Sequence, residues 1–280
     1  MGITPAKKSF QKDSIDEDLL NSLWNAIHIF IFDNLSNYND RGESDFFFFA
    51  KRVWIHFYKK PIDTIPSGRY GILKSDTISN IRKWFYSTEW HQVYDFIDFC
   101  MNEKIISSKR DFSKHLNGVL ERENSAYRFI DGKLSPITNT FEIEEIEKTL
   151  SLKDYTGLDE VNIHIESALK MLSEKENPDY RNSIKESISA VEALVNKIND
   201  SDNDTLGSAL NKIDSNVKIH KALKEGFKKI YGYTSDSDGI RHALNEMSTC
   251  DFEDAKFMLV SCSAFINYIV VKADKAGISL

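Results

Sequence analysis

The second half of this 280-residue chain carries three apolar stripes whose members repeat at alternating spacings of three and four residues. The stripes are Val161, Ile165, Ala168 and Leu172; Ile184, Ile188, Val191, Val195 and Ile198; and Ala255, Leu259, Cys262, Ile266 and Ile269. This spacing puts apolar side chains on one face of an α-helix, and such faces are buried by packing together. The pattern predicts an antiparallel helical bundle over residues 157–280. Shorter helical segments at 206–213 and 219–230, followed by a glycine-containing turn at 231–233, should connect the last two stripes.

The first half is richer in aromatic residues and less regular. It holds all four tryptophans and the run Phe46, Phe47, Phe48 and Phe49, which we assign to a core, with a domain interface as the next choice and base stacking as a weaker one. Helices are predicted at about 14–35, 44–59, 76–86, 89–103, 110–123 and 141–150, the first opened by a capping box at 14–17. Asp131-Gly132 between β-prone residues predicts a short hairpin near 126–137.

The expected fold class is therefore mainly α, in two domains. The best linker is the segment 154–157, so we place a helical N-terminal domain with one short β-hairpin at residues 1–156 and the helical bundle at residues 157–280. Hydrophobic residues make up 41% of the chain against 28% charged residues, which excludes a disordered chain.

Charge and apolar content limit the partners. The formal net charge of −7 provides no global positive field for a nucleic-acid duplex, so any RNA or DNA contact must be local. No apolar run approaches the roughly 18–20 residues of a membrane span, and the N-terminus lacks the apolar stretch of a signal peptide, so we expect no membrane contact and a cytoplasmic protein. Three cysteines without a CxxC pair favour reduced thiols, with Cys262 in the core.

Motifs for common cofactors and metals are missing from the sequence. The seven histidines are scattered without an HExxH pattern or a Cys/His pair at ligand spacing. The chain also lacks the GxxxxGK[ST], GxGxxG and GxSxG patterns. We therefore predict no cofactor and no metal.

One polar cluster, at residues 231–244, has the residue types needed for phosphate chemistry. Residues 235–238 are all potential N-caps, so a helix should begin near Gly239 with Arg241 and His242 in its first turn. The free N–H groups of a helix start, a guanidinium and an imidazole all suit a phosphate. The structural alternative is that Asp236 and Asp238 are caps, Arg241 pairs with one of them and His242 donates to a carbonyl.

A second polar tract, residues 180–192, follows one helix. On a helical wheel Arg181, Lys185 and Glu192 flank the apolar stripe, while Asn182 and Glu186 point away from it. A solvated face explains these residues. Arg181 and Lys185 gain a functional interpretation if the 231–244 cluster faces them.

Several separated tracts resemble one family of defence proteins. Residues 164–194, 230–244 and 251–270 resemble a HEPN domain of the kind found in bacterial abortive-infection proteins of the AbiJ type. Residues 123–150 resemble the N-terminal module that accompanies this HEPN type. The resemblance covers nearly the whole chain and implies a HEPN-like bundle.

The resemblance also implies a site and an activity. HEPN proteins are commonly homodimers, and many are metal-independent endoribonucleases or toxins whose R-x(4–6)-H motif comes from both subunits. His242 matches the histidine of that motif, but Arg241 is immediately adjacent and residues 236–238 are Asp, Ser and Asp. Two alternatives remain: Arg241 and His242 act together with Arg181 or Asn182, or the domain binds without cleaving.

The functional prediction is a metal-independent, toxin-like endoribonuclease of antiphage defence. Arg241 and His242 are the predicted catalytic residues; Arg181, Asn182, Lys185, Asp238 and Gly239 are the predicted substrate-binding residues. The predicted partners are single-stranded or structured RNA, with tRNA as one candidate, a second copy of the chain, and a phage-derived trigger. The alternatives are a non-catalytic HEPN module for dimerisation and sensing, and a nucleotide-binding regulator.

Overall fold

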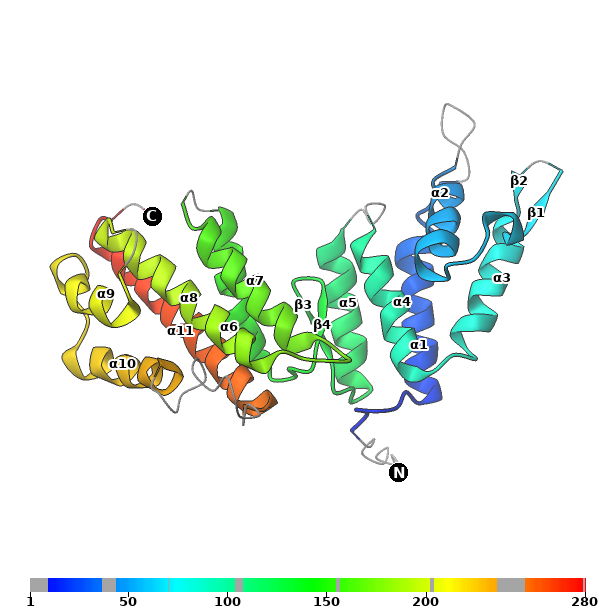
Figure 1. Ribbon diagram of the computed structural model, residues 1–280. Coiled ribbons are helices and arrows are strands. Elements are labelled where there is room, and N and C mark those ends of the chain that lie inside the picture. The colour runs from blue at the N-terminus through cyan, green and yellow to red at the C-terminus, as the bar shows by residue number, and fades with distance from the viewer. Residues whose placement is uncertain are drawn as a thin grey trace, which may run out of the picture. The chain divides into compact units, whose positions relative to one another are not determined.

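The computed structural model divides into two compact units, Met1–Pro136 and Ile137–Leu280 (Figure 1). It describes residues 10–36, 44–69, 71–103, 108–154, 157–201, 204–235, 250–278 and 280. Within this part of the chain, eleven α-helices and two small two-stranded sheets make up the regular structure, which confirms the mainly α fold class.

The elements of the N-terminal unit follow the predicted helices closely. They are α1 (Glu17–Ile27), the π-helix η1 (His28–Phe32), α2 (Asp45–Arg52), the π-helix η2 (Val53–Phe57), the 3-10 turn η3 (Ile62–Thr64), β1 (Ser67–Gly68), β2 (Gly71–Ile72), α3 (Lys74–Phe85), α4 (Trp90–Asn102), α5 (Lys109–Arg122), β3 (Arg128–Ile130) and β4 (Lys133–Ser135). The first helix is capped by Asp16, whose carboxylate accepts from the Leu19 N–H at 2.8 Å, and not by the predicted capping box at Ser14.

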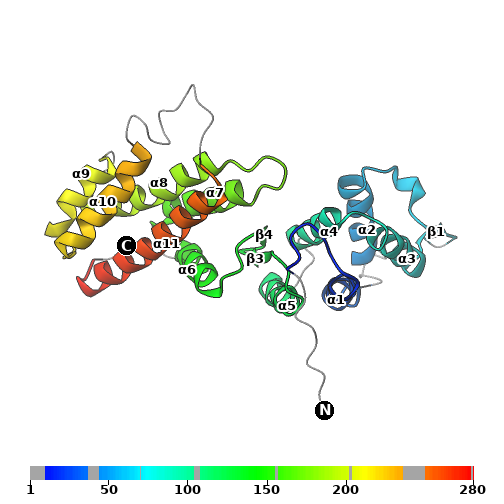
Figure 2. The same ribbon diagram turned by 90° about the horizontal axis from the view of Figure 1, so that it is seen from below.

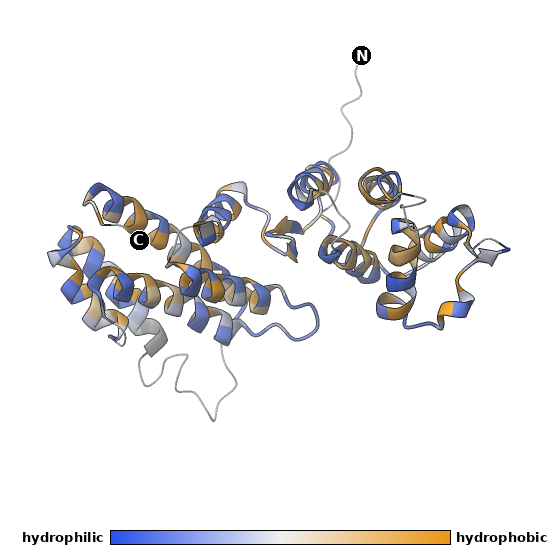
Figure 3. Cartoon of the chain, turned by 90° about the horizontal axis from the view of Figure 1, so that it is seen from above, coloured by the Kyte–Doolittle hydropathy of each residue, from blue (hydrophilic) through white to orange (hydrophobic). Residues whose placement is uncertain are grey.

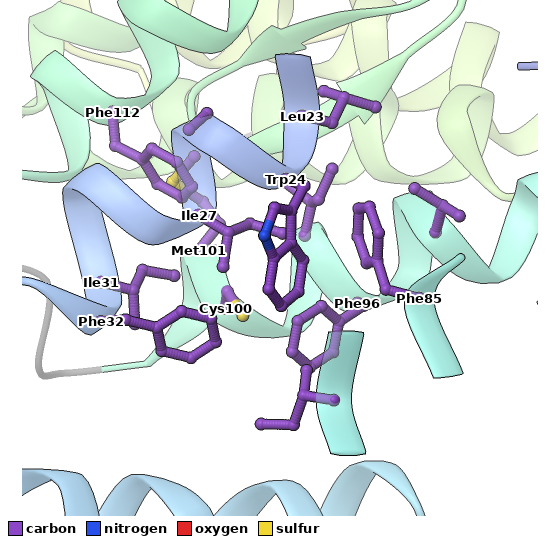
Figure 4. Close-up of a cluster of buried hydrophobic side chains, with 14 of the residues drawn as sticks. Leu23, Trp24, Ile27, Ile31, Phe32, Phe85, Phe96, Cys100, Met101 and Phe112 are labelled. Atoms are coloured by element: carbon purple, nitrogen blue, oxygen red, sulfur yellow. The ribbon is translucent and has the colours of Figure 1, made fainter. Parts of the chain in front are cut away.

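Aromatic side chains build the core of this unit. Figure 4 shows Trp24 of α1, Phe85 of α3 and Phe96 of α4 converging, and the Trp24 and Phe85 ring centroids are 5.3 Å apart. The phenylalanine run of α2 is divided between core and surface: Phe46 and Phe49 are buried, which confirms the core assignment for these two, while Phe48 is exposed. Consecutive residues point around most of a helix, so one run cannot lie entirely inside.

The predicted hairpin is present as β3 and β4. Asp131 and Gly132 both have positive φ, 47° and 75°, as a two-residue turn between right-twisted strands requires. The side chain of Asn117 in α5 accepts from the Phe129 N–H and donates to the Phe129 carbonyl, which fastens the hairpin to that helix. The very short ladder of β1 and β2 was not predicted, because two paired residues leave no alternating pattern in the sequence.

The C-terminal unit is a helical bundle. Its elements are α6 (Thr140–Leu150), the 3-10 turn η4 (Ser151–Asp154), α7 (Asp159–Ser173), α8 (Tyr180–Asn199), α9 (Leu206–Lys212), the 3-10 turn η5 (Ile213–Ser215), α10 (Lys221–Ser235) and α11 (Phe252–Lys275). Helices α8 and α11 lie side by side (Figures 1 and 2), and both contact α7. Every member of the three predicted stripes is buried.

Two predictions for α10 are wrong. The spacing of Ile219, Leu223, Phe227 and Ile230 in the predicted segment 219–230 puts Leu223 on the apolar face, but Leu223 is 44% exposed, whereas Lys224 beside it is buried. The predicted turn at 231–233 is instead part of the helix, which continues to Ser235. One glycine inside a helix costs only about 1 kcal/mol, and here packing outweighs it.

Helix α6 belongs to the second unit by its contacts. Asn267 of α11 donates to the Glu145 backbone carbonyl at 3.0 Å and to the Glu145 carboxylate at 2.7 Å. The Thr149 hydroxyl lies 3.2 Å from Asn267 Oδ1. The contacts between helices therefore divide the chain between residues 136 and 137. The predicted boundary between residues 156 and 157 was based on the linker segment 154–157 and lies after α6.

Helix α11 is apolar enough to be compared with a membrane span. It has 24 residues and a mean hydropathy of 1.4 over its most apolar window, and it is the one such helix in the described part of the chain. The sequence estimate of apolar run length missed it because scattered polar residues interrupt the run. Half of that window is buried inside the unit. The helices of both units carry hydrophobic and hydrophilic faces (Figure 3), which is the pattern of core packing.

Candidate functional site

The start of α8 carries three of the predicted binding residues. Asp179 caps the helix: one carboxylate oxygen accepts from the Asn182 N–H at 3.0 Å and the other from the Asn182 side-chain amide at 2.6 Å. Arg181 is half-buried, and Lys185, one turn further on, is exposed. The structure thus brings a guanidinium, an ammonium and an amide together on the first turns of one helix.

This helix start lies against the start of α11. The ring of Tyr180 meets the ring of Phe252 edge to face, with 6.3 Å between their centroids. Burial raises the pKa of the Tyr180 phenol, and the negative charges of Glu253 and Asp251 raise it further. The start of α8 is therefore next to the residues that directly follow the 236–249 segment in the sequence.

Four predicted site residues, Asp238, Gly239, Arg241 and His242, lie outside the described residues. The helices on either side of them are α10 and α11. Phe227 of α10 stacks on Phe265 of α11 with 3.7 Å between ring centroids. Asp251 and Asp254 form a reciprocal capping box at the start of α11. The segment thus joins two helices that pack together.

A histidine that the sequence analysis set aside is paired with a carboxylate. The Nδ1–H of His164 in α7 donates to Glu186 of α8 across 2.6 Å, and the side chains are 25% and 20% exposed. Glu186 was predicted on a solvated face, away from the apolar stripe of its helix; its carboxylate is instead partly buried against α7, which packs along α8. A carboxylate on Nδ1 fixes the tautomer and orientation of an imidazole. The two residues come from different helices, so no local spacing could have revealed the pair.

His164 also lines a polar pocket of about 480 Å³. Helices α7 and α8, the loop before α9, and Tyr231 of α10 enclose it; besides His164, its lining includes the acidic residues Glu160, Glu192 and Asp204 and the basic residue Lys197. Asn196 donates to the Asp204 carbonyl, but its buried Oδ1 has no hydrogen-bond partner among the described residues. A buried acceptor without a partner is costly, so a ligand with an N–H or O–H donor would be stabilised here.

The described residues contain neither a metal-binding cluster nor a reactive buried thiol. No group of three or more His, Cys, Asp or Glu side chains there has the arrangement of a metal site. Burial raises the pKa of the Cys100 and Cys262 thiols, which keeps both protonated and unreactive.

These features define a mainly α protein of two units. Its C-terminal helical bundle contains both the start of α8, which carries Arg181 and Lys185, and the polar pocket beside His164. Residues 1–152 match the family model described as AbiJ N-terminal domain 4, and the chain belongs to this family. Membership associates it with abortive infection, a bacterial defence against phage. No curated protein and no solved structure matches the chain.

Proposed function

We propose that this AbiJ-type protein is a metal-independent, toxin-like endoribonuclease with a HEPN-like C-terminal bundle, and that Arg241 and His242 are its catalytic residues. The observation that carries the proposal is the contact between Tyr180 and Phe252. It brings Arg181 and Lys185 to the end of the segment that contains Arg241 and His242. A shared site requires that the 231–244 cluster faces Arg181 and Lys185, and the contact supports this proposal by placing them beside the helix start that follows this cluster in the sequence.

The proposed reaction is transesterification within the RNA. The substrate's 2′-hydroxyl attacks the adjacent phosphorus as a base removes its proton, and the bond to the 5′-oxygen breaks as an acid protonates that oxygen. The products are a 2′,3′-cyclic phosphate and a 5′-hydroxyl. His242 is the proposed acid or base, and Arg241 stabilises the charge on the phosphoryl oxygens. Arg181, Asn182, Lys185, Asp238 and Gly239 are the proposed substrate contacts, with the backbone at Gly239 as an anion site.

The substrate that fits this proposal is an exposed single-stranded RNA loop, with a tRNA loop as one example. A chain with a net charge of −7 cannot hold a long duplex by its overall field, so recognition must come from a small cationic region. Two copies of the bundle would each supply one His242 near a shared cleft. Sedimentation of a monomer at micromolar concentration would contradict this arrangement.

The test is incubation of the purified full chain with total cellular RNA, with and without EDTA. We expect cleavage that EDTA does not affect, and His242→Ala should lower the rate by about 10²–10⁴ because proton transfer is lost. Arg241→Ala should lower it through lost charge stabilisation. His56→Ala, which removes an exposed histidine of the N-terminal unit, is the matched control and should retain activity. Unchanged cleavage by both folded variants, or cleavage abolished by EDTA, would contradict the mechanism.

The polar pocket beside His164 favours a second candidate, a regulator that binds a nucleotide without cleaving RNA. The Asn196 Oδ1, which has no partner among the described residues, would accept from a base amino group, and Lys197 and His164 would approach a phosphate. Thermal unfolding with a panel of nucleotides separates the two candidates. A shift in melting temperature that Asn196→Leu abolishes, in a protein without RNase activity, would favour the regulator.

A further inference from the structure

The N-terminal unit has a groove that the proposed catalytic site does not use. It has a volume of about 500 Å³ and is lined by Phe30 of η1 and one face of α5, from Asp111 to Arg122. The α5 positions that line it, including 111, 115, 118 and 122, follow the three- and four-residue spacing of a single helix face. Helices α1 and α5 lie side by side in this unit (Figure 2), so η1, which continues α1, reaches α5. We call this feature the α5 groove.

The aromatic side of the α5 groove, formed by Phe30 and His115, is supported by a buried core residue. The Phe30 ring lies 5.3 Å, centroid to centroid, from Phe112, which is fully buried in the core of the unit. The ring also lies 5.1 Å, centroid to centroid, from the imidazole of His115, which is exposed. Phe30 and His115 therefore offer adjacent aromatic surfaces on a rigid support, and aromatic surfaces of this kind stack on nucleobases.

The lining of the same groove has more basic than acidic side chains. Lys114 is exposed and has no ion-pair partner among the described residues. Arg122 is 62% exposed; it donates to Glu123 at 2.7 Å and to the Ser22 hydroxyl at 2.9 Å, so its guanidinium is oriented and still reaches solvent. Asp111 is the acidic residue of the lining, against the basic residues Lys114 and Arg122. Two basic side chains, one of them paired with Glu123, thus lie beside the aromatic rings in a chain with a net charge of −7.

A glycine keeps the middle of the groove open. Gly118 lies between Lys114 and Arg122, each one helical turn away, and a Cβ added there would meet no atom within 4 Å. A larger side chain at this position would project into the groove without disturbing the core. Position 118 therefore allows the groove to be filled by one substitution.

We propose that the α5 groove binds single-stranded RNA, with a base stacked on Phe30 and His115 and flanking phosphates held by Lys114 and Arg122. Single strands are favoured because a base must leave its neighbours to stack on a protein ring, and duplex bases are already stacked. This is a binding site in the N-terminal unit, separate from the catalytic residues proposed above. It stands whether or not the protein cleaves RNA.

The experiment measures binding of a short, fluorescently labelled single-stranded RNA to the full chain by anisotropy. All proteins carry His242→Ala, so that the RNA is not consumed. Gly118→Leu should weaken binding about tenfold by filling the groove and preventing stacking. Lys114→Gln should weaken it about three- to tenfold and reduce the slope of log affinity against log salt by about one.

Two matched controls distinguish the groove from general effects. Gly118→Ala adds a small side chain in open space, and Lys83→Gln removes an exposed lysine of α3; both should bind within about twofold of the parent. An abasic strand of equal length tests stacking without changing the protein, and should bind about tenfold more weakly. Circular dichroism verifies that Gly118→Leu is folded, while Lys114→Gln changes an exposed side chain.

Several results would overturn the proposal. These are equal affinity of Gly118→Leu and the parent, equal affinity for the abasic strand, equal affinity for duplex RNA, and competition by polyglutamate as effective as competition by RNA. The last would identify a site for acidic peptides. Cleavage by the parent protein is assayed in parallel. If the protein cleaves RNA but the groove variants bind RNA as the parent does, only the proposal of RNA binding in the groove is refuted. If the groove binds RNA but the parent protein does not cleave it, only the proposed ribonuclease activity is refuted.

Discussion

Two glycines of the N-terminal unit have opposite backbone requirements. Gly132 turns the β3–β4 hairpin with φ of 75°, where an L side chain is strained, whereas Gly118 lies inside α5 with open space around it. Gly132→Ala should lower the free energy of unfolding by about 1–2 kcal/mol. Gly118→Ala should raise it by about 0.5–1 kcal/mol. Denaturant unfolding of both variants measures the difference, and a shift of the same sign in both would refute this account of the turn.

Tyr94 makes stability depend on pH at the alkaline end. Its phenol is buried and shares a 2.8 Å hydrogen bond with the Ser125 hydroxyl. Burial raises the pKa of Tyr94 from 10.0 to about 12. Because the folded pKa exceeds the unfolded value, the stabilisation is complete below pH 10 and is lost as the pH rises toward 12.

We therefore expect the free energy of unfolding to fall between pH 10 and 12. The variant Tyr94→Phe should show a smaller fall over the same range, because it has no phenol to ionise. Denaturant unfolding at a series of pH values checks this. Equal pH dependence in the two proteins would mean that other groups cause the fall.

Among the elements, helices were predictable and their ends were less so. The apolar spacing located α3, α4, α5, α6, α7, α8 and α11 because each buries one face. It did not predict that α1 and α2 end in the π-helical turns η1 and η2. The orientation of Glu186 was also missed, because it depends on a neighbouring helix.

The contact between α6 and α11 depends on one asparagine. Asn267 is 4% exposed and joins Glu145 and Thr149 of α6 to α11. Asn267→Ala should lower the free energy of unfolding by about 1–3 kcal/mol, because it leaves buried polar groups without partners. A double-mutant cycle with Thr149→Val should give a coupling of about 0.5 kcal/mol or more. Additive effects would show that the two side chains do not interact in solution.

At the scale of the whole molecule, the sequence predicted the class of fold but only part of the candidate sites. The Arg241 and His242 cluster was visible because its residues are consecutive. The polar pocket could not be predicted, because His164, Glu192 and Tyr231 lie on three different helices and meet only after folding. The α5 groove was missed for the same reason, since Phe30 and Lys114 are far apart in the sequence.

The position of the boundary between the two units is a prediction about the whole chain. Helix α6 buries Ile143, Ile146 and Leu150 within the second unit, and each such side chain contributes about 2 kcal/mol. The fragment 137–280 should therefore unfold in one cooperative transition. The fragment 157–280, which lacks α6, should be several kcal/mol less stable and expose the side of α11 that carries Asn267. Denaturant unfolding of both fragments, followed by circular dichroism, measures this difference. Equal stability would support the boundary at 156/157, because it would mean that α6 adds nothing to the bundle.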